Sequence, residues 1–442
     1  MVCPGCGLDV AAREVLLMSA TSLRILVVLP MYGGSLPIGR YCAAALRGLG
    51  HQVRVFDAPL LYPAFTGVRG LGLAPAPAGQ LENAFLQFVS QAVWAMVREQ
   101  EPHLVLALAQ APLGRGLLQR LRRAGVRTAM WFVEDYKVFE YWRAFAPLYD
   151  LFAVIQKAPF FSLLAGAGQP NALYLPLAAL PEFHRPQELS PEEQREYGAD
   201  IGFLGAGYPN RRRAFRSLVG RDFRIWGSDW ENEPLLAPHL QRQGARIGEE
   251  ECVKIYNATR VNLNLHSSVS DADVVAQGDF VNPRTFELAA AGAFQLVDAR
   301  ALLPELFAPG ELATFTSLPE MLLGIDYYLA HPEERRAIAQ RGRERVLAEH
   351  TYARRMETLL AAVADCLGPW PEAEAPKAAD CGAAALPPDL AAGLQNMVHS
   401  LGLGPHAGFA DVVAALRARS GVLNEAEAGL LFLDEWRKQY RR

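Results

Sequence analysis

The chain has 442 residues, of which 51% are hydrophobic and 20% are charged, and its formal net charge is −4 at pH 7. This composition is typical of a globular protein long enough for about three domains. A charge so close to neutral argues against a general nucleic-acid or membrane-surface binder. No apolar run reaches the roughly 18 residues that a membrane span needs, so we expect no transmembrane segment.

Residues 1–21 are expected to form an N-terminal tail that carries the motif CPGC at Cys3 and Cys6. The apolar stretch of this tail is too short for a secretory signal, so we expect a cytoplasmic protein with reduced cysteines. CPGC resembles half of a zinc ribbon, but a structural zinc site needs four ligands and the sequence has no second CxxC. We therefore predict no metal site, with a zinc site shared between two subunits as the alternative.

Strand and helix patterns alternate through the first part of the chain. An apolar strand pattern at 24–30 is followed by the turn YGGS, a helical pattern at 38–50 and a second strand pattern at 52–58. Further strand patterns lie at 104–108, 127–133, 151–156 and 172–177. Apolar strands that alternate with helices predict a parallel sheet with both faces covered. We assign 22–180 to a first Rossmann-like domain.

A polar, proline-rich segment at 181–198 has no strand pattern and predicts a linker. A second alternating series follows, with strand patterns at 199–205, 223–227, 261–265, 294–298 and 313–317. We assign 199–348 to a second Rossmann-like domain. Ligands of such sheets bind beyond the carboxyl ends of the strands, so we expect a ligand between the two domains.

Three segments follow the second domain. The sequence predicts a crossover helix at 349–368, an Ala- and Pro-rich linker at 369–389 and an accessory helical module at 390–442. The expected fold class is therefore α/β, with two tandem Rossmann-like parallel-sheet domains and a small C-terminal helical extension. Contact with a protein partner is the role we consider for the C-terminal helices.

A glycine turn at Gly33 and Gly34 separates the first strand from the first helix. Glycine lets the backbone approach a ligand, and a helix start offers free N–H groups that bind anions. The motif is not GxGxxG, and an acid at the end of the second strand, Asp57, is too common to prove a dinucleotide site. A simple tight turn is the alternative interpretation.

The second domain opens in a similar way, with FLGAGYPNRRRAF at 203–215. Gly205 and Gly207 follow the strand, and Arg211 and Arg212 lie at the start of the next helix. Arginine binds phosphate oxygens through two parallel hydrogen bonds, so this segment predicts a diphosphate site. The alternative is a solvated basic helix start, which opposes the helix dipole.

The segment FVNPRTFELAAAG at 280–292 predicts a short helix that Asn282 caps and Pro283 begins. We expect its N-terminus to face the cleft between the domains. Glu287 stands among apolar neighbours and needs a hydrogen-bond partner there. An i,i+3 ion pair with Arg284 is one interpretation, and a pair of ligand hydroxyls is the other.

Other polar side chains stand at strand ends or just before this helix. Asp279 precedes the helix, His266 ends the strand pattern VNLNL, and Glu134 with Asp135 ends WFVED. Because strand ends in this architecture border the cleft, we consider these residues as candidates for catalysis. A structural histidine and helix-capping acids are the alternatives.

Taken together, these stretches resemble the GT-B nucleotide-sugar glycosyltransferases, in particular the CgeB-like group. LPMYGGS is similar to the opening of the family's first domain, and DIGFLGAGYPNRR to the opening of its second. DFVNPRTFELAAAGAFQLVD resembles the donor-site signature, and EHTYARR the closing helix. The resemblance covers about 22–367.

This resemblance implies roles for several residues. The larger family carries Glu-x7-Glu at the donor site, and Glu287 matches the second acid, which binds the ribose hydroxyls. Asp279 takes the place of the first acid, which touches the transferred sugar, and is one methylene shorter. Arg211 and Arg212 match the basic residues on the diphosphate, which replace a metal ion. The predicted donor-binding residues are Gly33, Gly34, Gly205, Gly207, Arg211, Arg212, Asn282, Arg284, Thr285 and Glu287.

The expected function is therefore metal-independent transfer of a sugar in the cleft, from a donor bound by the second domain (199–348) to an acceptor bound by the first (22–180). The co-substrate is a nucleotide-diphosphate sugar, no further cofactor is expected, and the acceptor is a glycan, a protein or a small molecule. A nucleotide-sugar epimerase is an alternative on the same scaffold. A non-catalytic module that binds nucleotide-sugar or scaffolds an assembly is the alternative from another class.

Overall fold

The computed structural model describes residues 22–269, 273–275, 278–370, 388–404 and 407–439. The CPGC motif at Cys3 and Cys6 lies outside these residues, as does most of the predicted linker at 369–389. The chain divides into two compact units, Met1–Glu372 and Ala373–Arg442.

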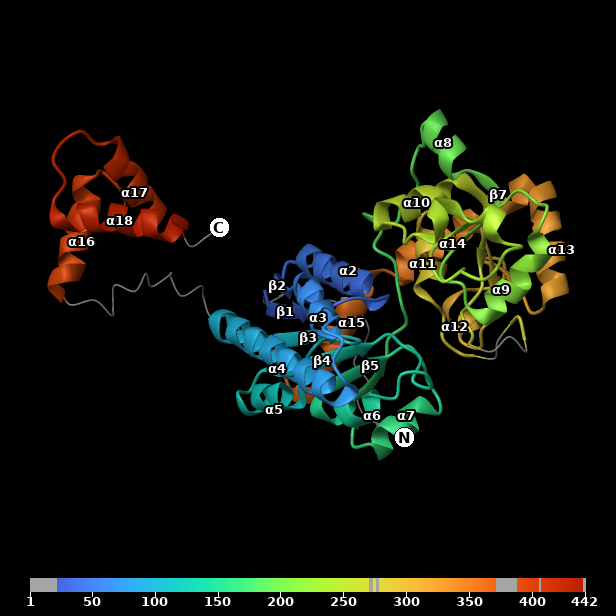
Figure 1. The fold of residues 1–442 in the computed structure, drawn as a ribbon, viewed down its shortest axis with the longest axis horizontal. Coiled ribbons are helices and arrows are strands. Elements are labelled where there is room, and N and C mark those ends of the chain that lie inside the picture. The colour runs from blue at the N-terminus through green and yellow to red at the C-terminus, as the bar shows by residue number, and fades with distance from the viewer. Residues whose placement is uncertain (1–21, 270–272, 276–277, 371–387, 405–406, 440–442) are drawn as a thin grey trace, which may run out of the picture. The chain divides into compact units, whose positions relative to one another are not determined.

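The first sheet of the larger unit has six parallel strands in the order β2-β1-β3-β4-β5-β6 (Figure 1). These strands are β1 (Arg24–Val28), β2 (Gln52–Phe56), β3 (Leu104–Leu108), β4 (Arg127–Phe132), β5 (Leu151–Val154) and β6 (Ala172–Tyr174). In its register, Val27 of β1 pairs with Val55 on one side and Leu106 on the other. Each strand pattern predicted in this part of the chain forms a strand of this sheet.

Both faces of this sheet are packed, because alternate residues of a strand face opposite sides. Ile25 lies in a core shared with α2 (Ser35–Gly48) and α15 (Tyr352–Leu367). Leu26 lies in a separate core on the other face, to which α4 (Pro75–Gln100) contributes. The other helices of this lobe are α3 (Tyr62–Arg69), α5 (Arg115–Arg123), α6 (Trp142–Phe145) and α7 (Phe160–Gly166).

The second sheet has five parallel strands in the order β11-β10-β9-β7-β8. These strands are β7 (Ala199–Leu204), β8 (Phe223–Trp226), β9 (Thr259–Asn264), β10 (Gln295–Asp298) and β11 (Ala313–Phe315). Its helices are α8 (Pro191–Tyr197), α9 (Pro209–Phe215), α10 (Glu249–Ala258), α11 (Pro283–Ala290), α12 (Leu303–Leu306), α13 (Leu318–Ala330) and α14 (Pro332–Glu349). The two parallel sheets confirm the predicted fold class.

Each sheet has a point where the strand order reverses. In the first sheet β1 lies between β2 and β3, and in the second sheet β7 lies between β8 and β9. At such a point the connections leave on opposite faces and open a crevice beyond the carboxyl ends of the strands. The loops after β1 and β7 carry the two glycine turns of the sequence, so the fold places both turns at crevices.

The smaller unit contains α16 (Pro388–Ser400), α17 (Phe409–Ala418) and α18 (Glu425–Gln439). Met397, Val412 and Leu416 form its buried centre. No helix among the described residues is both long and apolar enough to cross a lipid bilayer.

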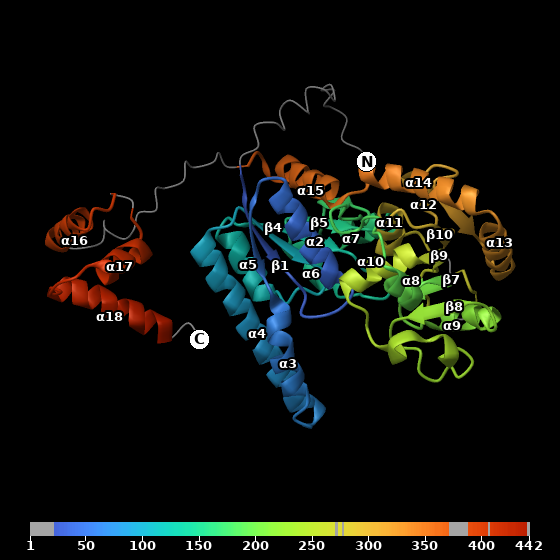
Figure 2. The same ribbon diagram turned by 90° about the horizontal axis from the view of Figure 1, so that it is seen from above.

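The chain returns from the second lobe to the first through α15, which packs on α2 (Figure 2). Arg355 of α15 donates to the carbonyl oxygens of Pro176 at 2.7 Å and Leu177 at 3.2 Å. Its Nη2 also donates to Nδ1 of His350 at 2.7 Å, and Nε2 of His350 donates to the Leu306 carbonyl at 2.7 Å. Burial and the Arg355 cation lower the pKa of His350 to about 4.

This arrangement predicts that acid destabilises the larger unit through His350. The unfolded chain binds a proton near pH 6.5, whereas the folded chain resists it until about pH 4. Protonation of His350 therefore leaves the free energy of unfolding unchanged above pH ~6.5. As the pH falls from there toward ~4, it lowers the free energy of unfolding by no more than about 3 kcal/mol. We expect His350→Gln to show a flatter dependence of the unfolding free energy on pH over this range. Equal slopes for the two proteins in denaturant titrations would contradict the prediction.

Candidate active site

A cavity of about 1270 Å³ is lined by residues from the carboxyl ends of both sheets. Gly33 and Gly34 line it from the loop after β1, and Gly205 from the loop after β7. Arg284 and Glu287 line it from α11. The structure therefore brings together predicted donor-binding residues from three separate segments, in a space large enough for a ligand.

Gly33 and Gly207 show why glycine is needed in these turns. Gly33 has a φ of 103°, which side-chain-bearing residues rarely adopt. A Cβ on Gly207 would lie 2.0 Å from the carbonyl oxygen of Asp229, because the loops after β7 and β8 touch there. Gly33 thus forms part of the cavity wall, and Gly207 allows the loops after β7 and β8 to touch.

Glu287 has a protein partner as well as a place on the cavity wall. Its Oε2 accepts a hydrogen bond from the Tyr256 hydroxyl of α10 at 3.1 Å. Tyr256 is 2% exposed and lines the same cavity. The structure thus pairs Glu287 with Tyr256, in place of the i,i+3 ion pair with Arg284 that the sequence left open.

Arg284 supplies a positive charge at the cavity that the protein does not fully satisfy. Within the described part of the chain, its Nε is buried without a hydrogen-bond partner. Burial acts to lower the pKa of Arg284, but Tyr256 and the Glu287 carboxylate outweigh that effect and raise the pKa above its usual value. The side chain is therefore charged at neutral pH, in a residue that lines the cavity.

Arg211 adds a second buried cation nearby. Its Nε donates to the Leu265 carbonyl at 2.9 Å and its Nη1 to the Ala206 carbonyl at 3.0 Å. Burial and the Arg284 cation lower the pKa of Arg211 to about 10. Two arginines close enough to repel each other remain charged at neutral pH, and a bound anion would relieve that repulsion.

Arg212 supports the loop after β7. Its Nε donates to the Gly207 carbonyl at 2.6 Å, and its Nη2 donates to the Asp229 carbonyl. These bonds hold the glycine turn against the loop after β8. The position of Arg212 fits a role in ordering the turn, and contact with a ligand stays a prediction.

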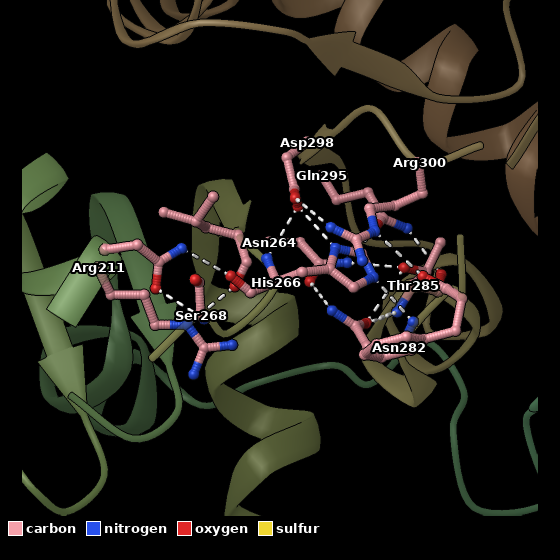
Figure 3. A network of polar contacts seen from close by, with 12 residues as sticks. Arg211, Asn264, His266, Ser268, Asn282, Thr285, Gln295, Asp298 and Arg300 are labelled. Atoms are coloured by element: carbon pink, nitrogen blue, oxygen red, sulfur yellow. Dashed lines mark hydrogen bonds and ion pairs between the residues drawn. The ribbon is translucent and has the colours of Figure 1, made fainter. Parts of the chain in front are cut away.

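A buried network fixes the start of α11 (Figure 3). As predicted, Asn282 caps this helix, because its Oδ1 accepts from the Thr285 backbone N–H at 3.1 Å. Its Nδ2 donates to Oδ1 of Asn264 at 2.8 Å, and Asn264 donates to the Thr285 hydroxyl and to Gln295, each at 2.9 Å. Thr285 is 0% exposed, so the expectation that it contacts the donor directly is corrected to a role inside the helix anchor.

His266 belongs to the same network (Figure 3) and has both ring nitrogens occupied. Its Nδ1 donates to Oδ1 of Asp298 at 2.6 Å, and its Nε2 accepts from the Asn282 backbone N–H at 2.9 Å. Burial lowers the pKa of His266, so the imidazole is neutral at pH 7. With 1% of its surface exposed, His266 fits the structural alternative, which corrects the expectation of a catalytic base.

Asp279 and Asp135 lie together, although one comes from each lobe. Nε2 of Gln156, which follows β5, donates to Oδ1 of Asp279 at 2.9 Å and approaches Oδ1 of Asp135 at 3.4 Å. Burial lowers the pKa of the nearby Arg300, against the opposing effect of Asp298, Asp279 and Asp135. The two acids thus form a cluster across the lobes, and their catalytic roles stay predictions.

Glu134 lies in a different set of contacts within the first lobe. It accepts hydrogen bonds from the Tyr141 hydroxyl at 2.9 Å and from the Gln110 amide. Burial raises the pKa of Glu134 even though both bonds oppose that shift. This carboxylate is a stronger base than an exposed glutamate, which keeps it a candidate for proton transfer.

Sequence reasoning missed several residues of the site. Tyr256 lies within a helix, where an aromatic residue usually signals core packing. Gln156, Asp298 and Arg300 follow strand ends, so the rule that selected His266 would also have selected them. In the described ranges, no group of three or more His, Cys, Asp or Glu side chains is placed to hold a metal ion.

Comparisons with known proteins show what this chain is similar to. The family model described as "Glycosyl transferase-like" matches residues 211–361. The spore protein CgeB of Bacillus subtilis is 23% identical over 264 residues, which cover 57% of this chain and 80% of CgeB.

Solved structures share the fold at low sequence identity. Sucrose-phosphate synthase from Thermosynechococcus elongatus matches with a TM-score of 0.53 and 14% identity, over 76% of this chain and 97% of that one. HepE from Anabaena in complex with UDP-glucose matches with a TM-score of 0.52 and 12% identity, over 78% of this chain and 100% of that one. These likenesses confirm the predicted arrangement of two Rossmann-like sheets.

The network at the start of α11 predicts that His266→Phe destabilises the protein. The change leaves the Asn282 N–H without its acceptor and removes the ring hydrogen bond to the Asp298 carboxylate, which keeps the backbone N–H of residue 266. A buried polar group left unpaired costs about 1–3 kcal/mol, and a lost hydrogen bond to a charged group about 1.5–3 kcal/mol. We expect the unfolding free energy in denaturant titrations to fall by at least about 2 kcal/mol. His399→Phe, the same change at an exposed position, serves as the control. A wild-type unfolding free energy for His266→Phe would mean that the network does not anchor the helix.

Proposed function

We propose that this chain, a CgeB-like glycosyltransferase of the GT-B fold, takes its sugar from a nucleotide-diphosphate donor bound in the 1270 Å³ cavity. The acceptor hydroxyl oxygen bonds to the anomeric carbon and the hydroxyl releases its proton, while the diphosphate leaves with the electron pair of the broken bond. The family match and the paired sheets support the class of reaction. The polar groups that line the cavity support the choice of donor.

One observation carries this proposal: the cation Arg284 and the anion Glu287 line the same cavity. Within the described part of the chain Arg284 has a buried Nε without a hydrogen-bond partner, and Arg211, which lies behind the cavity-lining residues, is a second cation close to it. Together they suit the two negative charges of a diphosphate. Glu287, held by Tyr256, suits a pair of neutral hydroxyls such as those of a ribose.

The donor we propose to test first is UDP-glucose, because HepE, which shares the fold, was solved in complex with it. In this chain the ribose would lie against Glu287 and the diphosphate against Arg284 and Arg211. Asp279 is proposed to lie at the transferred sugar. His266, Asn282 and Thr285 are positioning residues in this scheme, because they fix the first turn of α11.

Metal independence is part of the proposal. In many transferases a divalent ion neutralises the leaving diphosphate, and here the two arginines supply the positive charge for that purpose. A cytoplasmic location and a protein partner for α16–α18 also stay predictions. Phe432 and Leu433 of α18 are 68% and 49% exposed, which gives the partner prediction a surface to test by substitution.

Donor hydrolysis separates an enzyme from a non-catalytic binding module. We expect the wild-type protein to release UDP slowly from UDP-glucose in the absence of an acceptor, at the same rate with and without EDTA. Tight binding of UDP-glucose with no UDP released, with every acceptor tried, would favour the non-catalytic module. A rate that disappears with EDTA and returns with a divalent ion would overturn metal independence alone.

Glu287→Gln tests the ribose contact directly. Gln keeps an oxygen for the Tyr256 hydroxyl but loses the charge, and a hydrogen bond to a charged group is worth about 1.5–3 kcal/mol. We therefore expect calorimetry to show a rise of about 10- to 100-fold in the Kd for UDP-glucose. Glu333→Gln on the exposed face of α14 is the matched control. An unchanged Kd together with lower thermal stability would assign Glu287 a structural role only.

A further inference from the structure

A second, smaller cavity lies within the first lobe. Its volume is about 310 Å³, which is at the lower end of the range for small-molecule sites, about 300–1,000 Å³. Apolar side chains dominate its wall, among them Phe65, Leu113, Met130 and Phe145. No part of the proposed donor contacts requires this space.

The two cavities are neighbours. Met31 and Tyr32, in the loop after β1, line both of them. Tyr32 is 44% exposed, and its ring packs against Tyr62 with centroids 4.8 Å apart. A molecule in the smaller cavity therefore lies next to the larger one, with the Tyr32 side chain at the border.

Five polar side chains line the smaller cavity, namely Tyr32, Arg69, Gln110, Tyr141 and Tyr149. The backbone N–H of Gln110 donates to the Tyr141 oxygen at 2.9 Å, and the Tyr141 hydroxyl donates to Glu134 at 2.9 Å. The Gln110 amide also donates to Glu134, and its Oε1 lies 3.9 Å from where a Cβ on Gly33 would stand. Because Gly33 lines the larger cavity, Gln110 reaches from one cavity toward the other.

We propose that the smaller cavity is the acceptor site, and that it takes a small molecule with an aromatic or branched aliphatic body and one hydroxyl. This inference rests on the proposed function. The body of the acceptor fills the apolar part, and its hydroxyl lies at Gln110 and Tyr141, facing the donor cavity. Glu134 holds both side chains in position.

The mostly apolar wall suits a free sugar less well than an apolar molecule. A sugar ring carries hydroxyls on most of its carbons, and a buried hydroxyl without a partner costs about 1–3 kcal/mol. Most residues that line the cavity carry no polar side-chain group, so several hydroxyls of a bound sugar would lack a partner. A flat apolar molecule with one hydroxyl has no such cost.

The test reduces the volume of the cavity by a substitution and measures the binding of umbelliferone, a fluorescent aromatic alcohol. Ala111 lines the cavity and is partly buried, so Ala111→Phe removes space for a ligand. We expect this variant to weaken umbelliferone binding at least about tenfold in fluorescence titrations with UDP present, and to slow umbelliferone glucosylation from UDP-glucose. Ala165→Phe, the same change at an exposed position of α7, should behave as the wild type.

Further measurements keep the inference separate from the proposed function and from misfolding. UDP-glucose binding and hydrolysis should be unchanged in Ala111→Phe, and their absence in the wild type would count against the donor proposal instead. Phe145→Ala, which removes an aromatic wall, should also weaken umbelliferone binding and provides a second variant if Ala111→Phe unfolds. Equal umbelliferone affinity in all variants, no binding to the wild type, or glucosylation of methyl glucoside in preference to umbelliferone would overturn the inference.

Discussion

The hydrogen bond from the Asn282 backbone to the His266 imidazole fixes where α11 begins, and the arrangement of the site depends on it. Nε2 of His266 can accept this bond because Asp298 holds the proton on Nδ1. Burial acts to raise the pKa of Asp298, but the interactions with His266 and Arg300 outweigh that effect and lower the pKa below its usual value. A charged aspartate and a neutral histidine, both buried, therefore form one unit with the capped start of the helix.

The position of α11 decides which of its side chains meet the cavity. Thr285 and Phe286 are 0% exposed, so they face the protein interior. Arg284 and Glu287, one turn apart, line the cavity instead. If the helix began one residue later, each of its side chains would be rotated by about 100° around the helix axis. Arg284 and Glu287 would then no longer line the same cavity.

Two switch points of the sheets explain why the cavities lie where they do. The loop after β1 contributes Met31, Tyr32, Gly33 and Gly34 to cavity walls, and the loop after β7 contributes Gly205 and Ala206. In a parallel sheet these loops diverge to opposite faces, which leaves room for a ligand. The lobe that carries Arg211 and Arg284 fits the proposed anionic donor. The mostly apolar cavity of the other lobe fits the proposed acceptor.

The sequence by itself determined the strands, their grouping into two series and the cap of α11, because these follow from local periodicity and from the chemistry of a few adjacent residues. It also selected Glu287, since a carboxylate among apolar neighbours needs a partner wherever it lies. Only the tertiary structure decided which partners meet. It paired Glu287 with Tyr256, buried His266 against Asp298, and joined Asp279 to Gln156 across the lobes. These pairings depend on how distant segments pack, and no spacing along the chain records that.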